Sequence, residues 1–347
     1  MNRRDALKLL RSGLVVSAAS SIAPQLHAAA KKRDRRPVAL LLPLTGERAA
    51  LGLSMQRAAM LAESDASALL ALDTGGTPAG AAAAALQARK RGAAMILGPL
   101  SAGETAAAAS AIGNTLPMIA FTNTPAAAAS GAFVFGLTAQ QSTSSVLRYA
   151  RSRGVRSVVV IGDGSAWSEA AAQSARNLQG ELGLDIRAVT VAPGAALPAA
   201  GDPPDAVLLP GSGDAVLAAA RNLKDTGIQM LGTVQALDNR PSALDALTGA
   251  WIASPDPAAF GTFSGSYAAR NGGSPGALAA LAYDAAGIAR TLRNAKMLSR
   301  EGLLGTESFA CVTGAVRFRT DGSCARDLAI LVAERDGYRT VATSRGA

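Results

Sequence analysis

The chain has 347 residues, of which 49% are hydrophobic and 17% are charged, so it can bury cores for two lobes of ordinary size and is not disordered. Aromatic residues make up only 4%, which leaves little for stacking nucleic-acid bases. The formal net charge is +9, but the arginines are scattered and form no basic stripe. Nucleic acid is therefore not an expected partner.

The first thirty residues have the order of a secretory signal peptide. A basic start with paired arginines precedes a short apolar run, and three alanines at 28–30 offer a cleavage site. The run is too short to span a membrane, and the paired arginines resemble a twin-arginine signal. We expect residues 1–30 to be removed, which leaves 31–36 as a basic, flexible N-terminus of a periplasmic protein without a membrane span. The net charge then falls to +6, because four basic residues and one acidic residue are lost.

Short apolar runs alternate with longer helix-forming segments in the first third of the remaining chain. Strands are predicted at 38–42, 69–72, 94–97 and 117–120, with helices between them at 53–63, 78–91 and 102–112. Alternation of strands with crossover helices predicts a parallel sheet that is covered by helices on both faces.

The same pattern then restarts, which predicts a second α/β lobe. Helices are predicted at 140–153, 168–182 and 214–224, and strands at 157–161, 186–191, 206–209 and 229–231. A segment rich in Pro, Gly and Ala at 192–204 is a predicted surface loop. Two further helices, 258–270 and 278–293, precede hairpin-like strands at 315–319 and 328–332, with Asp-Gly turns at 321–322 and 336–337.

The residue inventory argues against an enzyme and against a metal site. His27, the one histidine, lies within the signal peptide, so the mature chain lacks Ser-His-Asp and Cys-His nucleophiles and histidine-based zinc sites. No phosphate-binding glycine loop follows a strand, and no cofactor is expected. For Cys311 and Cys324, an oxidising periplasm favours a disulfide, which would add roughly 3 kcal/mol by closing a short loop. Two unlinked, partly buried thiols are the alternative.

Ligands of open parallel sheets bind outside the carboxyl ends of the strands, where loops and helix N-termini meet. Three predicted strands of the first lobe are followed by loops with small or hydroxylic residues. The candidate ligand-binding residues in these loops are Thr45, Ser101, Ala102, Gly103, Thr122, Asn123 and Thr124.

Each of these candidates also has a purely structural interpretation. Ser101 and Glu104 fit the S-x-x-E capping box, so Ser101 can serve as a helix cap as well as a ligand contact. Thr122 and Thr124 can satisfy loop backbone groups instead of a ligand. In the second lobe, Trp167 follows a strand-end loop, where an indole either covers a ligand or closes the core.

Taken in order, the segments resemble the type I periplasmic binding fold of the Leu/Ile/Val-binding family. Residues 38–62, 96–101 and 116–120 resemble its first, third and fourth strands with their loops. Tyr283-Asp284-Ala285 resembles a late helix motif, and 309–322 resembles the C-terminal hairpin. The resemblance covers nearly all of residues 37–345.

This resemblance implies two doubly wound, Rossmann-like lobes joined by three crossovers. The implied boundaries are 37–136 plus 242–311 for lobe 1, and 137–241 plus 312–345 for lobe 2. A small polar or anionic, amino-acid-like ligand would bind between the lobes, with hinge closure, for an ABC importer. The implied partners are that small molecule and an ABC permease.

The resemblance also assigns roles to individual residues. In amino-acid-binding members, a serine loop and an Ala/Thr loop grip the ligand carboxylate, and these match 101–103 and 122–124. An aromatic residue of the second lobe matches Trp167. Ser212 stands where a tyrosine is expected, and Gln235 stands where an acid would hold an α-ammonium group, so both are candidate ligand contacts that depart from the amino-acid pattern.

A subset of the fold, the penicillin-binding-protein activators, resembles this chain more closely. The similarity lies in Asp73-Thr74-Gly75-Gly76 and in the segment 92–100. It implies an alternative function, an interaction protein that regulates peptidoglycan synthesis through a degenerate cleft, with a peptidoglycan synthase as its partner.

Overall fold

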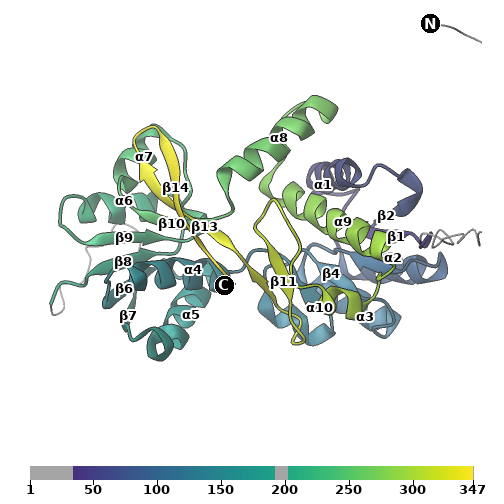
Figure 1. Cartoon of the computed structure of the whole chain (residues 1–347), viewed down its shortest axis with the longest axis horizontal. Coiled ribbons are helices and arrows are strands. Elements are labelled where there is room, and N and C mark those ends of the chain that lie inside the picture. The colour runs from purple at the N-terminus through teal and green to yellow at the C-terminus, as the bar shows by residue number, and fades with distance from the viewer. Residues whose placement is uncertain (1–33, 192–201, 347) are drawn as a thin grey trace, which may run out of the picture. The chain divides into compact units, whose positions relative to one another are not determined.

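The computed structural model describes residues 34–191 and 202–346, which form two lobes, each built around its own β-sheet (Figure 1). The expected signal peptide, residues 1–30, lies outside the described residues. In the described part of the chain, no helix combines the length and apolar character that crossing a membrane requires. The predicted α/β fold with two lobes is confirmed.

Lobe 1 contains a parallel sheet, sheet A, with the strand order β2-β1-β3-β4-β5. Its strands are β1 (Val38–Leu42), β2 (Leu69–Asp73), β3 (Met95–Leu97), β4 (Met118–Ala120) and β5 (Phe133–Val134). The first four match the predicted strands to within one residue. The fifth was not predicted, because two residues carry no periodicity.

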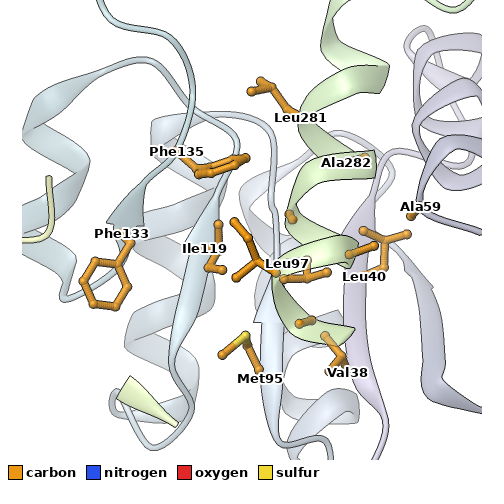
Figure 2. Packing of buried hydrophobic residues seen from close by; sticks show 14 of the residues in the cluster. Val38, Leu40, Ala59, Met95, Leu97, Ile119, Phe133, Phe135, Leu281 and Ala282 are labelled. Atoms are coloured by element: carbon orange, nitrogen blue, oxygen red, sulfur yellow. The ribbon is translucent and has the colours of Figure 1, made fainter. Parts of the chain in front are cut away.

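The apolar run of β1 is buried on both faces. Ala39 and Leu41 belong to one core cluster, whereas the even-numbered residues of β1 belong to another. Because successive strand residues point to opposite faces, a strand between two helical layers needs apolar residues at every position. Figure 2 shows the second of these clusters, in which Leu40 packs with Leu97 of β3.

Helices cover both faces of sheet A. They are α1 (Ala49–Ala62), α2 (Pro78–Lys90), α3 (Ala102–Ile112), α9 (Ala277–Ala295) and α10 (Arg300–Gly305), with short 3-10 turns η1 (Ala66–Ala68) and η2 (Pro125–Ser130). α8 (Pro257–Asn271) packs on α1 and α9 instead of on the sheet. α2 packs against α3 on one face, and α1 packs against α9 on the other. The buried stripe of α2 consists of Ala81, Ala84, Ala85 and Ala88 at helical spacing, so the alanine-rich segments are regular helices, as predicted.

Lobe 2 contains a seven-stranded mixed sheet, sheet B, with the order β14-β13-β10-β9-β8-β6-β7. Its strands are β6 (Ser157–Gly162), β7 (Asp185–Thr190), β8 (Ala206–Leu209), β9 (Gln229–Gly232), β10 (Trp251–Ser254), β13 (Leu328–Glu334) and β14 (Gly337–Ser344). β13 and β14 are antiparallel, and the other pairs along the sheet are parallel except β10 with β13.

Helices also cover both faces of sheet B. They are α4 (Ala139–Ser152), α5 (Ala166–Leu182), α6 (Asp214–Leu223) and α7 (Pro241–Leu247), together with the 3-10 turn η3 (Val234–Ala236). α4 and α5 pack into one core cluster, and α6 and α7 pack into the cluster on the opposite face. Both lobes therefore have the three-layer arrangement that alternating strands and helices predict.

The chain passes between the lobes three times, after β5, after β10 and after β12 (Cys324–Arg326). From the sheet membership of each strand, we propose that, among the described residues, lobe 1 comprises 34–136 plus 255–326, and lobe 2 comprises 137–191, 202–254 and 327–346.

Two segments differ from the sequence-based boundaries. Those boundaries place 242–254 in lobe 1, whereas β10 pairs with β9 and β13 of sheet B. They also place 312–326 in lobe 2, whereas β11 (Val316–Phe318) and β12 pack into a core cluster of sheet A. β10 was not recognised in the sequence, because its apolar run stops after three residues at Ser254.

The C-terminal part forms two separate hairpins instead of one. β11 pairs with β12 around the Asp-Gly turn at 321–322, and β13 pairs with β14 around the one at 336–337. The turns were predicted correctly. The second strand of the first hairpin was missed because β12 contains the charged Arg326 and lacks an apolar run.

A buried arginine connects two of the crossovers to lobe 1. Arg326 is fully buried, and it donates to the Phe135 carbonyl (2.6 Å) and to Thr313. Thr313 and Val312 in turn donate through their N–H groups to Asp284 of α9 (2.9 and 2.7 Å). Burial raises the pKa of Asp284, and these hydrogen bonds offset part of the rise. Since Phe135 and Arg326 lie at the first and third crossovers, the network fixes both chain segments where they leave lobe 1.

Candidate functional site

The loop after β1 is held by a carboxylate from the neighbouring strand. Thr45 donates its hydroxyl to Asp73 Oδ2 (2.6 Å), and the Leu44 N–H donates to Asp73 Oδ1 (2.8 Å). Partial burial alone would raise the pKa of Asp73, but hydrogen bonds from Thr45, Gly75 and Leu44 lower it below the ordinary value. The hydroxyl of Thr45 is therefore committed to shaping its own loop.

The serine loop after β3 forms a complete capping box at the start of α3. Ser101 Oγ accepts from the Glu104 N–H (3.3 Å), and Glu104 Oε2 accepts from both the N–H and the hydroxyl of Ser101 (3.1 and 2.7 Å). Glu104 is fully buried, and its other oxygen accepts from the Thr74 hydroxyl (2.8 Å). The capping interpretation of Ser101 is confirmed, because both of its polar groups are engaged within the loop.

The loop after β4 contains one structural threonine and two exposed polar residues. Thr122 is buried, and its hydroxyl accepts from the Thr124 N–H (3.2 Å). Asn123 and Thr124 are exposed, and Thr124 precedes η2 without a side-chain cap hydrogen bond. These two side chains are the polar groups of the lobe 1 loops that line the pocket described next.

A pocket of about 440 Å³, which we call the interlobe pocket, lies between this loop and two helices of lobe 2. Lobe 1 contributes Asn123, Thr124 and Pro125, and α4 contributes Ala139 and Gln140. One stripe of α5 forms the remaining wall, with Ala166, Trp167, Ala170, Gln173, Ser174 and Asn177.

The indole of Trp167 is held in a fixed orientation. Its Nε1–H donates to Thr233 Oγ1 (3.1 Å), and the Thr233 hydroxyl donates to the Pro210 carbonyl (2.6 Å). Thr233 is fully buried, whereas Trp167 is half-buried and lines the pocket. The indole therefore lies in the wall of the pocket and is not a member of the core clusters that the described residues of lobe 2 form.

α4 and α5 run parallel to each other, and the first turns of both helices line the pocket. Near their C-terminal ends, Arg148 forms an ion pair with Glu181 (2.7 Å), and Arg151 Nε donates to the Leu182 carbonyl (2.6 Å). Helices whose C-terminal ends are paired in this way also have neighbouring N-termini. The positive ends of two helix dipoles therefore meet at one wall of the pocket.

The first turns of these helices line the pocket and contain backbone N–H groups that have no acceptor within the helix. The cap hydroxyls of Thr138 and Ser165 accept from the N–H groups of the third helical residues, Gln141 and Ser168 (3.1 and 3.2 Å). The first two N–H groups of a helix have no acceptor within the helix. In both helices these two residues line the interlobe pocket. This end of the pocket can bind an anion without a cationic side chain.

The structure brings together only part of the predicted site. Asn123, Thr124 and Trp167 line the interlobe pocket. The other candidates do not line it as far as the described residues define it, and these are Thr45, Ser101, Ala102, Gly103, Thr122, Ser212 and Gln235. The side chains of Ser212 and Gln235 are exposed, and the Gln235 N–H donates to Thr233 Oγ1 (3.3 Å). Gln235 thus helps to fix the acceptor of the indole.

Four polar lining residues were not found by sequence reasoning. Gln140 lies on α4, and Gln173, Ser174 and Asn177 lie on α5. The sequence did contain a signal for the three residues on α5. Residues 170, 173, 174 and 177 follow Trp167 at spacings of three, six, seven and ten, and these spacings place them on the same side of a helix as Trp167.

The expected disulfide is absent from the structure, where both cysteines are free thiols. Cys324 is buried on β12, and its thiol donates to the Val134 carbonyl (3.2 Å), while Gln141 Nε2 donates to the Cys324 carbonyl (2.6 Å). Burial raises the pKa of the Cys311 thiol well above its ordinary value. The alternative of two unlinked, partly buried thiols therefore describes this structure.

Two α/β lobes, three crossovers and a pocket walled by both lobes define a two-lobed binding protein. The model of the periplasmic binding protein family matches residues 37–337. The chain belongs to this family. A comparison with curated protein sequences gives no match.

Solved structures with the same fold include proteins with different roles. A Rhodospirillum rubrum protein assigned to a branched-chain amino acid ABC transporter is 22% identical, with a TM-score of 0.77 over 88% of this chain and 100% of that chain. The C-domain of LpoA from Haemophilus influenzae, a regulator of PBP1A, is 17% identical, with a TM-score of 0.71 over 88% and 100%. A solute-binding protein from Rhodopseudomonas palustris in complex with 3,4-dihydroxybenzoic acid is 17% identical, with a TM-score of 0.61 over 90% and 98%. At these identities the similarity establishes the fold alone.

Proposed function

We propose that the protein is an exported, periplasmic solute-binding protein that captures a small polar or anionic ligand between its lobes and delivers it to an ABC importer. The observation that carries this proposal is the interlobe pocket, whose walls come from both lobes. A ligand in such a pocket contacts both lobes at once and thereby stabilises the closed arrangement. The proposal involves no catalytic step. The relative from Rhodopseudomonas palustris holds an aromatic carboxylic acid, which supports a small carboxylate as the ligand.

The test is thermal melting of the purified protein against a broad panel of metabolites. A ligand at a hundred times its Kd stabilises the folded state by about 2.7 kcal/mol, which raises the Tm by several degrees. We expect at least one small carboxylate to do so, and native mass spectrometry should show one bound molecule per chain. If no member of the panel raises the Tm, the proposal of solute capture fails.

Export is tested separately by the mass of the protein recovered from the periplasm. The proposal predicts a mature chain that begins at residue 31. Recovery of the protein only from the cytoplasm, with residues 1–30 retained, would contradict it.

A second candidate function is regulation of a peptidoglycan synthase, which the similarity to the LpoA C-domain supports. In that case the cleft is degenerate, and the outer surface binds the partner. A pull-down with a purified transpeptidase distinguishes the two functions. Regulation predicts retention that Trp167→Ala leaves unchanged, whereas solute capture predicts no specific retention.

A further inference from the structure

The interlobe pocket is longer than a single small amino acid requires. Its α5 wall extends from Ala166 to Asn177, and eleven residues of helical rise correspond to about 16 Å. An extended chain advances about 3.4 Å per residue, so this wall can accompany roughly four residues of an extended ligand. The pocket is therefore a groove along α5 with two distinct ends.

One end of the groove suits a carboxylate. It is formed by the first turns of α4 and α5, whose N-termini lie side by side. Backbone N–H groups and two helix dipoles favour a negative charge there. Neither Lys nor Arg is among the described residues that line the pocket, so the backbone would supply this selectivity.

The groove offers no partner for an ammonium group. No Asp or Glu is among its described lining residues. Asp163, at the end of β6, already accepts from the Ser168 hydroxyl (2.6 Å) and the Ser165 N–H (2.9 Å). Asp321 lines an adjoining hollow of about 250 Å³ and accepts from the Ser323 hydroxyl (2.7 Å). A free amino acid would therefore place its ammonium group without a counter-charge, which is costly in a partly desolvated site.

The residues that line the other end of the groove are neutral hydrogen-bonding groups, and the Arg176 guanidinium lies just outside this lining. Gln173 Nε2 donates to Asn177 Oδ1 (2.8 Å), and the Arg176 guanidinium donates to Gln173 Oε1 (3.2 Å). Ser174 is 6% exposed, and its hydroxyl has no hydrogen-bond partner among the described residues. Carboxamide and hydroxyl groups both donate and accept, which matches the amide groups of a ligand.

We infer that the groove binds a carboxylate whose neighbouring nitrogen is acylated, that is, an N-acyl amino acid or the C-terminal end of a short peptide. The carboxylate lies at the N-termini of α4 and α5, the side chain lies against Trp167, and the amide groups extend along α5 towards Gln173 and Asn177. This inference rests on the proposed function, because it names the ligand class of the same pocket.

Matched probes test the inference with the wild-type protein by isothermal titration calorimetry. They are leucine, N-acetyl-leucine, N-acetyl-leucinamide and acetyl-Ala-Ala-Leu. We expect N-acetyl-leucine to bind at least tenfold more tightly than leucine, and also at least tenfold more tightly than N-acetyl-leucinamide, which lacks the carboxylate. Tighter binding of acetyl-Ala-Ala-Leu than of N-acetyl-leucine identifies a peptide as the source, and equal binding identifies an N-acyl amino acid.

The helix-end contact is tested by a proline that removes one N–H group. Ala166 is the first residue of α5, where proline is tolerated, and the preceding Ser165 already has an extended backbone. Ala166→Pro should reduce the preference for N-acetyl-leucine over N-acetyl-leucinamide by at least threefold, since the carboxylate loses a donor. Ala277→Pro, at the first position of α9, is the matched control and should leave the preference unchanged.

The outcomes distinguish failure of the inferred ligand class from failure of the proposed function, solute capture. If leucine binds as tightly as N-acetyl-leucine, or if the carboxylate contributes less than tenfold, the inference is overturned while solute capture stands. If neither these probes nor any member of the metabolite panel binds, the proposed function fails as well.

Discussion

The strand-end loops of lobe 1 and the helix starts of lobe 2 differ in which polar groups they leave without internal partners. In lobe 1, Thr45 is engaged by Asp73, and Ser101 is engaged by Glu104, so these loops satisfy their own hydrogen bonds. In lobe 2, the hydroxyls of Thr138 and Ser165 are engaged as helix caps, but the first two residues of α4 and α5, whose N–H groups have no acceptor within the helix, line the pocket. The comparison teaches that a polar loop indicates a binding site only when its groups lack internal partners.

The largest expected effect is on the stability of the lobe 1 loops. Glu104→Ala removes a buried carboxylate and leaves groups of Ser101 and Thr74 without their acceptor, so the free energy of unfolding should fall by about 3 kcal/mol. Urea denaturation measures this. Glu104→Gln, which keeps the shape and one acceptor, should lose less. A loss below about 1 kcal/mol would show that the loop does not depend on this network.

The second-largest expected effect is on the free energy of ligand binding, in lobe 2. Trp167→Ala removes the aromatic wall and should weaken binding of the pocket's ligand by about 2 kcal/mol, roughly thirtyfold. The Tm without ligand should fall as well, because the half-buried indole and its hydrogen bond to Thr233 are lost, so the affinity is measured at a temperature at which both proteins are folded. Trp167→Phe keeps a ring and should retain more affinity than Trp167→Ala. Unchanged affinity in both variants would place the ligand elsewhere.

Ser101→Ala separates the capping role from a ligand contact. Loss of an N-cap hydroxyl costs about 1 kcal/mol, so the free energy of unfolding should fall by that amount. The Kd of the ligand should stay the same, because Ser101 does not line the pocket in the described part of the chain. A weaker Kd without a stability change would reverse this assignment.

The smallest effect concerns acid stability. The pKa of Asp73 is lowered in the folded state, so its stabilising contribution is present above its unfolded pKa of about 3.9 and is lost as pH falls through the lower, folded value. Asp73→Asn should lower the Tm near neutral pH, and the difference should disappear in strong acid. Melting curves from pH 7 to pH 2 measure it. A difference that is constant across this range would contradict the account.

Much of the fold followed from the sequence because its strands are buried on both faces. The run 38–42 is apolar at every position, and such a run between turn residues predicts a parallel strand covered by two helical layers. β10 and β12 were not found in this way although they are no shorter than β3 and β4, because each ends in a polar residue, Ser254 or Arg326, that shortens its apolar run. Their assignment to a lobe depends on pairing partners that are far away in the sequence.

The candidate site was predictable only in part, for a different reason. Trp167 and the loop at 123–124 were found because they follow strands, where ligands of α/β proteins bind. Ser101 was open to two interpretations, and the pairing with Glu104 that decides between them is visible only in the structure. The role of α5 was missed because Gln173 and Asn177 look like ordinary solvent-exposed helix residues until the neighbouring loop is placed beside them.

The central claim is that a ligand binds between the lobes against Trp167, and the fluorescence of this residue tests it most directly. The chain has two tryptophans, and Trp251 packs against Tyr149 in the core of lobe 2 (ring centroids 5.0 Å apart), so Trp251→Phe leaves Trp167 as the reporter. For a ligand that raises the Tm, the account predicts a saturable change in emission with one molecule bound per chain. An unchanged emission while the Tm rises would show that the ligand binds outside the interlobe pocket.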